Sequence, residues 1–201
     1  MALLDLAISP GLMVAPYLLF AKLFGADADL QTSVAVGLIL WHWLSTLFWE
    51  VGYGLENDLE EGVLESLLVA PISIGTMLAA KSVVATLRNL YITASTASWI
   101  LLFGIALPLP WPLFIGIALL GGLALSGFIM IFASSVLLLK RSESLGVTLQ
   151  TVFGALAGVT ISPQLFPMGV WILSRTIPLT YGIEAARRLL RGQPIADQVL
   201  W

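Results

Sequence analysis

Long apolar runs separated by short polar breaks make up most of the chain. A helix needs about 20 mainly apolar residues to cross a bilayer, and residues 6–24 and 30–53 both reach this length. A cleavable signal peptide is the alternative for the first run, because residues 26–28 have the small-x-small form of a cleavage site. Residues 1–6 carry no positive charge, however, which such a signal needs. The pattern therefore favours two membrane helices at the start of the chain.

The third apolar tract, residues 74–107, is too long for one perpendicular span, because a helix rises about 1.5 Å per residue. Lys81 and Arg88 interrupt its first half. We expect residues 74–88 to start at the membrane surface and residues 89–107 to lie in the hydrocarbon.

Proline divides the second half of the chain. Three prolines within residues 108–112 predict a turn, because proline cannot continue a helix, and a fourth span follows at residues 113–139. The charged loop 140–144 precedes a fifth span at residues 145–161. Further prolines break residues 164–177 into pieces too short to cross the bilayer, which indicates a re-entrant or interfacial segment.

A short amphipathic helix is predicted over residues 181–191. Glu184 precedes Arg187 by three residues and Arg188 by four. Side chains at these spacings are neighbours on a helix surface, so we expect ion pairs between them.

The charged loops also predict the orientation of the chain. The positive-inside rule places loop 140–144 and the surface segment with Lys81 and Arg88 on the cytoplasmic side. We therefore expect loop 54–75 on that side too, with residues 108–111 outside. Five spans then put the arginines of the last third on the outer side, against the same rule.

One polar stretch, between the second and third spans, stands apart from these runs. It contains five of the twelve acidic residues: Glu56, Asp58, Glu60, Glu61 and Glu65. Residues 62–69 alternate as an amphipathic helix, with leucines on one side and acids on the other, and Pro71 ends it. Such a helix lies flat at the membrane face and leaves its polar side free to meet a partner.

The composition agrees with an integral membrane protein. The 201 residues are 59% hydrophobic and only 10% charged, whereas soluble domains carry about 25% charged residues. The net charge of -3 gives no basic patch for nucleic acid. These values exclude an ordinary soluble enzyme, a disordered chain and a nucleic-acid binder. They indicate an all-α polytopic membrane protein of one domain, with about five spans.

Three motifs that could carry chemistry lack the residues that the chemistry needs. Residues 75–82 nearly match a phosphate-binding loop, but Ala80 replaces the glycine before the lysine. Ser126 has no base nearby in the sequence, since the one histidine, His42, lies in an earlier span. His42 alone cannot form a metal site, and the chain has no cysteine. We therefore expect no catalytic residue and no metal site, and His42 to make an interhelical hydrogen bond.

Small residues inside the spans predict close helix packing, and polar residues there predict a water-filled pathway. Gly154 and Gly158 form a GxxxG pair, and Gly122 and Ser126 have small-xxx-small spacing, which is typical of packed membrane helices. An acid inside a membrane is a functional candidate by default. The alternative for Glu50 is that its carboxylate reaches the membrane interface. The alternative for the polar side chains of residues 89–96 is that they only form hydrogen bonds between helices. The pathway candidates are Glu50, Asn89, Thr93, Ser95 and Thr96.

Two segments resemble type-two ABC transporter permeases. The first is Glu61-Gly-Val-Leu-Glu-Ser-Leu-Leu-Val-Ala-Pro-Ile-Ser73, followed by a helix with Lys81. The second runs from Phe166-Pro through Pro-Leu-Thr-Tyr181 to Arg187. Both segments occur in the expected order among the spans.

The resemblance implies a membrane subunit of an ATP-driven exporter in the plasma or inner cell membrane. ATP would bind to a separate ATPase subunit, and the chain itself would hold no cofactor. A second permease subunit, identical or different, would complete the transporter. The helix that contacts the ATPase would contain Glu61, Gly62, Leu64, Glu65, Leu68 and Pro71. External re-entrant helices would contain Phe166, Pro167, Pro178, Tyr181 and Arg187.

The chain also departs from the resembling family at both ends. That family usually has a longer amphipathic lead before its first span and a sixth span after the segment matching Arg191. We therefore expect residues 1–201 to form an incomplete type-two transmembrane domain. The alternatives to a permease are a stand-alone channel or secondary transporter and, less favoured by the residues present, an intramembrane enzyme.

Overall fold

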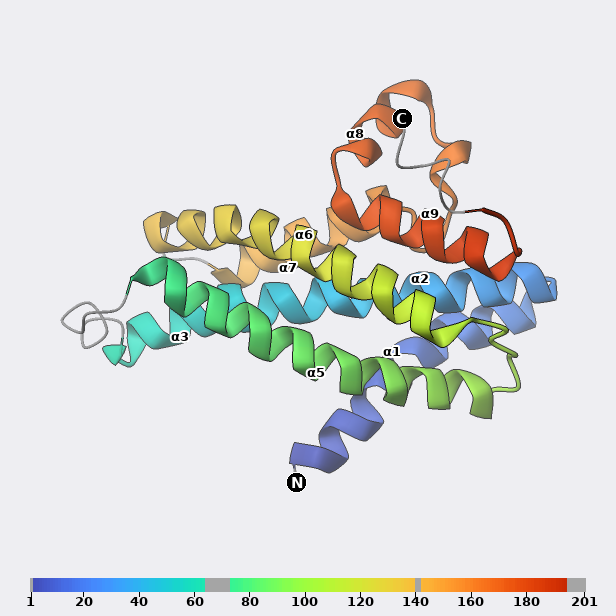
Figure 1. The fold of residues 1–201 in the computed structure, drawn as a ribbon, viewed down its shortest axis with the longest axis horizontal. Coiled ribbons are helices and arrows are strands. Elements are labelled where there is room, and N and C mark those ends of the chain that lie inside the picture. Colours follow the sequence, from blue (N-terminus) through green and yellow to red (C-terminus); the bar gives the residue numbers. More distant parts are fainter. Residues whose placement is uncertain (1, 64–72, 140–141, 195–201) are drawn as a thin grey trace.

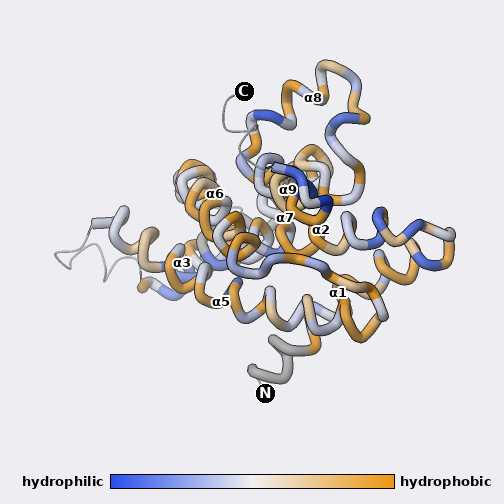
Figure 2. Tube along the Cα trace, turned by 45° about the vertical axis from the view of Figure 1, so that its right-hand side comes forward, coloured by the Kyte–Doolittle hydropathy of each residue, from blue (hydrophilic) through white to orange (hydrophobic). Residues whose placement is uncertain are grey.

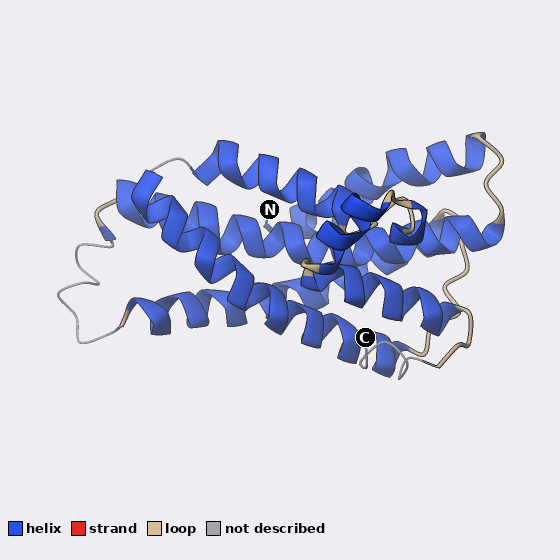
Figure 3. Ribbon diagram, turned by 90° about the horizontal axis from the view of Figure 1, so that it is seen from above, coloured by secondary structure: helices blue, strands red, loops and turns tan. Residues whose placement is uncertain are grey.

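The computed structural model describes residues 2–63, 73–139 and 142–194, and all regular structure in these ranges is helical (Figures 1 and 3). The prediction of an all-α fold is confirmed. The elements in chain order are α1 (Ala2–Leu23), α2 (Ala28–Leu47), the π-helix η1 (Phe48–Tyr53), α3 (Gly54–Glu60), α5 (Ile74–Leu102), α6 (Trp111–Leu139), α7 (Ser142–Leu156), the 3-10 helix η2 (Pro163–Leu165), α8 (Met168–Arg175) and α9 (Pro178–Leu190).

The long helices lie side by side, and α8 stands away from them (Figure 1). The end of α3 and the start of α5 lie at one end of the bundle, and the start of α2 and the end of α5 lie at the other. We call these the α3 end and the α2-start end. Figure 2 shows mainly hydrophobic positions along the long helices, with hydrophilic positions near the α1–α2 turn and on α9.

Two helices among the described residues, Ala28–Glu50 and Trp111–Phe132, are long and apolar enough to cross a membrane by length and composition. The second belongs to α6, whose 29 residues equal the length of α5. α5 carries more polar residues, which lowers its hydropathy. The number of five spans therefore stays a prediction.

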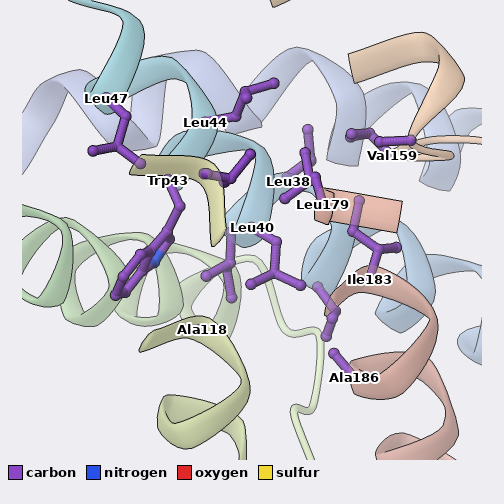
Figure 4. Packing of buried hydrophobic residues seen from close by; sticks show 14 of the residues in the cluster. Leu38, Leu40, Trp43, Leu44, Leu47, Ala118, Val159, Leu179, Ile183 and Ala186 are labelled. Atoms are coloured by element: carbon purple, nitrogen blue, oxygen red, sulfur yellow. The ribbon is translucent and has the colours of Figure 1, made fainter. Parts of the chain in front are cut away.

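The helix α2 is the centre of the bundle and contacts α1, α5, α6, α7 and α9. Its side chains meet Ala118 of α6 and Leu179 and Ile183 of α9 (Figure 4). Lipid is as apolar as leucine, so tight packing, rather than removal from water, holds such helices together. Trp43, only 1% exposed, is the largest fully buried side chain.

Glycines allow tryptophan rings to lie directly against neighbouring helices. A Cβ at any of three glycines would overlap a ring: Gly11 with Trp99, Gly122 with Trp43 and Gly154 with Trp41. The predicted packing roles of Gly122 and Gly154 therefore correspond to real helix contacts. Gly158 acts differently, because its φ of 82° places it in the turn after α7. The GxxxG pair is thus not one helical packing face.

Four predicted boundaries are wrong. The fifth span, expected over residues 145–161, ends early, because α7 stops at Leu156 and Gly158 turns the chain. α5 ends at Leu102, not at residue 107, because Gly104 turns the chain with a φ of 74°. Pro112 lies inside the first turn of α6 rather than in the preceding turn, since a proline there loses no helical hydrogen bond. For the same reason Pro178 begins α9, which runs over Pro178–Leu190 rather than 181–191.

Candidate functional site

Two ion pairs join the α3 end of the bundle into one unit. Lys81 of α5 lies 2.7 Å from the carboxylate of Asp58 in α3 and donates to the carbonyl of Gly54 at 3.2 Å. About two helical turns further along α5, Arg88 pairs with Glu50 of η1. The two basic residues that were expected at a membrane surface thus bind the preceding helical segment.

The π-helix η1 joins α2 to α3. A π-helix is rare and is often found at functional sites. Phe48 is only 3% exposed and contacts Phe132 of α6 and Phe153 of α7, with ring centroids 4.8 and 6.1 Å apart. Glu50 lies on the same segment. The segment therefore anchors in the core on one side and carries the ion-paired acid on the other.

A turn at Glu61 and Gly62 follows α3. Glu61 caps α3 through its backbone N–H, and its carboxylate accepts a hydrogen bond of 2.9 Å from Asn57. Gly62 has a φ of 71°, which favours glycine. Gly62 therefore belongs to the turn that ends α3 and not to the interior of a following helix. The other residues predicted for the ATPase contact, Leu64, Glu65, Leu68 and Pro71, lie outside the described residues.

A polar stripe runs along the buried face of α5. Asn89 and Thr96 are fully buried and Thr93 is 6% exposed. Trp43 of α2 donates its indole N–H to the Thr93 hydroxyl at 2.9 Å. Within the described part of the chain, neither the Asn89 amide nor the Thr96 hydroxyl has a hydrogen-bond partner. Buried polar groups without partners are rare and call for an explanation.

The structure thus brings three of the five predicted pathway residues onto one face. Ser95 is half-buried and lies off this stripe. Glu50 lies instead beside a cavity of about 240 Å³ between α1, α2, η1 and α5. Whether these residues line a pathway stays a prediction.

His42 lines the same cavity as Glu50 and Arg88. Its Nδ1 donates to the carbonyl of Leu38, 3.1 Å away and one turn earlier in α2. The expected hydrogen bond between helices is therefore replaced by one within a helix. Besides the Trp43–Thr93 bond, an interhelical bond near this region comes from Gln150 of α7, which donates to Ser45 of α2 at 2.8 Å.

The sequence motifs that lack the residues for chemistry adopt ordinary helical structure. Residues 75–82 lie inside α5 and form no phosphate-binding loop. Ser126 donates to the carbonyl of Gly122 in its own helix at 2.7 Å. Within the described ranges, no three His, Cys, Asp or Glu side chains are grouped closely enough to hold a metal ion.

The predicted re-entrant segment forms a compact pair of short helices. Phe166 and Pro167 precede α8, and Pro178 starts α9. Arg175 at the end of α8 lies 3.0 Å from the carboxylate of Glu184 in α9. Tyr181 donates to the Arg175 carbonyl at 3.0 Å.

The guanidinium of Arg175 also lies over two aromatic rings, those of Trp171 and Tyr181. The ion pair between Arg175 and Glu184 was not predicted, because spacing along the sequence indicates only partners within one helix.

Arg187 ties α9 to the rest of the bundle. Its Nη2 donates to the carbonyl of Val159 at 2.9 Å, and its Nε to the carbonyl of Ser33 at 3.5 Å. These contacts join α9 to α2 and to the turn after α7. Sequence spacing could not identify either acceptor, because both are backbone carbonyls far away in the chain.

The chain matches a protein-family model. The model described as ABC-2 type transporter matches residues 9–190. The match covers most of the chain and extends from α1 to the last residue of α9. No curated protein and no solved structure matches the chain.

Proposed function

Because this chain belongs to the ABC-2 type transporter family and forms its membrane-embedded permease, we propose that it serves an ATP-driven exporter. In this proposal a separate ATPase subunit binds and hydrolyses ATP, and the chain moves an unidentified substrate across the cell membrane. A second permease subunit faces the first across the pathway.

The ion-paired α3 end supports the coupling step of this proposal. The segment implied to contact the ATPase begins at the turn of Glu61 and Gly62, directly after α3. Lys81 holds α3 through both Asp58 and Gly54, so a displacement of α3 is passed to α5. α3 also continues through η1 into α2. A push at this end therefore reaches the two helices that meet at the polar stripe.

The polar stripe supports a role in the transport step. Asn89 and Thr96 have hydrogen-bonding groups without partners in the described structure. A state in which α2 and α5 separate would let these groups bind water or substrate. ATP binding favours one of two states only if the ATPase contacts the permease differently in each.

Charge variants of the Lys81–Asp58 pair test the coupling. We expect Lys81→Met to reduce permease-dependent ATP hydrolysis when the chain is reconstituted in liposomes with the ATPase subunit encoded in the same gene cluster. The exchanged pair Asp58→Lys with Lys81→Asp should recover part of the activity. Glu65→Arg, outside the described residues, should weaken copurification with the ATPase.

Lys22→Met at the α2-start end is the matched control, since it removes a lysine that does not touch α3. Hydrolysis that is equal for wild type and Lys81→Met at matched protein levels would contradict the proposed coupling. Absence of any complex with the ATPase would contradict the exporter itself.

A further inference from the structure

A cavity of about 330 Å³ with charged residues in its walls lies at the α2-start end of the bundle. Its walls come from the first turns of α2, from the connection between α5 and α6, and from the end of α9. The charged residues in these walls are Asp29, Arg187 and Arg191. Two cations thus face a single acid.

Arg187 lines this cavity, and within the described residues one of its hydrogen-bond donors is left without a partner. Its side chain is 7% exposed, and backbone carbonyls hold its Nε and Nη2 in place. Its Nη1 is buried and finds no hydrogen-bond partner among the described residues. A guanidinium is always protonated and presents its donors in a rigid plane. A fixed cation with a spare donor is an anion-binding group.

Arg191 adds a second cation from the next turn of α9. It lies four residues after Arg187, on the same face, and is exposed. Burial, together with the positive charge of Arg191, lowers the pKa of the Arg187 guanidinium to about 10, while Glu184 acts in the opposite direction. The two guanidinium groups therefore repel each other unless an anion lies between them.

Two further features raise the positive potential around the cavity. Lys22 of α1 donates to the carbonyl of Phe103, and the next residue, Gly104, lines the cavity. The 20-residue helix α2 begins in the cavity wall, and the N-terminus of a helix attracts anions. Asp27, which caps α2 by accepting from the Leu30 N–H, and Asp29 in the first turn oppose this potential.

We propose that this cavity binds a phosphate group through Arg187 and Arg191. Phosphate accepts hydrogen bonds from several guanidinium donors at once, and arginine recognises it in this manner. The phosphate comes either from a soluble compound or from a lipid headgroup. The proposal does not rest on ATP coupling, because the purified permease alone can be tested.

The first experiment measures phosphate binding to the full chain, purified in a neutral detergent and phosphate-free buffer. Sodium phosphate is added at constant ionic strength, and the melting temperature is followed by tryptophan fluorescence. We expect a saturable rise for wild type. Arg191→Gln should weaken the apparent affinity about tenfold, as for the loss of one charged hydrogen bond.

The second experiment tests a lipid source. Native mass spectrometry compares the chain exchanged into micelles that contain phosphatidic acid or a diacylglycerol with the same acyl chains. We expect phosphatidic acid to stay bound to wild type, and less of it to Arg191→Gln. Binding in only one of the two experiments identifies the source of the phosphate.

Arg188→Gln is the matched control, because Arg188 lies on α9 but does not line the cavity. It should behave as wild type in both experiments. Arg187→Gln can fail to fold because the contacts of Arg187 hold α9 in place. The decisive variant is therefore Arg191→Gln, at an exposed residue. Absence of a saturable response in both experiments, or equal responses of wild type and Arg191→Gln, would overturn the proposal.

Discussion

The carbonyl oxygen of Val159 lies against the Cα of Gly37, so closely that any Cβ at position 37 would overlap it. The same oxygen accepts the hydrogen bond from Arg187. The turn after α7, the middle of α2 and the end of α9 therefore meet at one point. A side chain at position 37 would push all three apart.

Gly37→Ala should accordingly destabilise the protein. The new methyl group meets backbone, which cannot move aside as a flexible side chain can, and overpacking of this kind typically costs about 1–3 kcal/mol. The measurement is the melting temperature of the purified variant. Gly116→Ala in α6 is the control, because a Cβ there has no atom within 4 Å and alanine favours helix by up to about 1 kcal/mol. A Gly37→Ala variant as stable as Gly116→Ala would contradict the packing.

Glu50 and Arg88 should stabilise the folded protein mainly through their ion pair. Removing one partner leaves an unpaired charge where α5 meets η1, and a partly exposed pair of this kind contributes up to about 1 kcal/mol. We expect Glu50→Gln and Arg88→Gln each to lower the amount of folded protein in membranes. The double variant should recover part of the loss, because it leaves no single charge. Additive losses, measured by gel filtration of the solubilised protein, would show that the pair is not coupled.

The α8–α9 pair should depend on Arg175. Glu184 is 5% exposed, and removing one partner of a buried charge destabilises the protein. Arg175→Met should therefore speed hydrogen exchange in α8, while Arg175→Lys should have a smaller effect because it keeps the charge but loses the stacking on Trp171 and Tyr181. Unchanged exchange in Arg175→Met would mean that packing alone holds α8.

The shared cavity predicts which segments lie on one side of the membrane. Ala106 and Arg191 both line it, so Ala106→Cys and Gln193→Cys should react with the same impermeant thiol reagent in intact cells. Asn57→Cys, at the other end, should react only after the cells are opened. The native chain has no cysteine, so each signal comes from the introduced residue. Labelling of Asn57→Cys but not of Ala106→Cys in intact cells would reverse the orientation.

The helices were predictable where apolar runs and prolines decide their length, but their partners were not. The all-α fold and the amphipathic α9 follow from periodicity. The starts of α6 and α9, at Pro112 and Pro178, were misplaced because a proline can begin a helix as well as end one.

Polar contacts were harder to predict, since they depend on which helices become neighbours. Arg175 and Glu184 are separated by a turn between two short helices, and His42 finds its acceptor within its own helix. The buried stripe of Asn89 and Thr96 could be identified as unusually polar. That it faces α2 requires the tertiary fold.

The π-helix at residues 48–53 has a consequence for insertions and deletions in the gene. A π turn holds about one residue more than an α-helical turn, and each helical residue rotates the chain by about 100°. The chain after it is therefore rotated by about that angle relative to α2. Loss of a single codon here would let the segment relax into α-helix and rotate Asp58 away from Lys81, although no residue of the ion pair had changed. The length of this short segment is thus constrained even where its individual side chains are not.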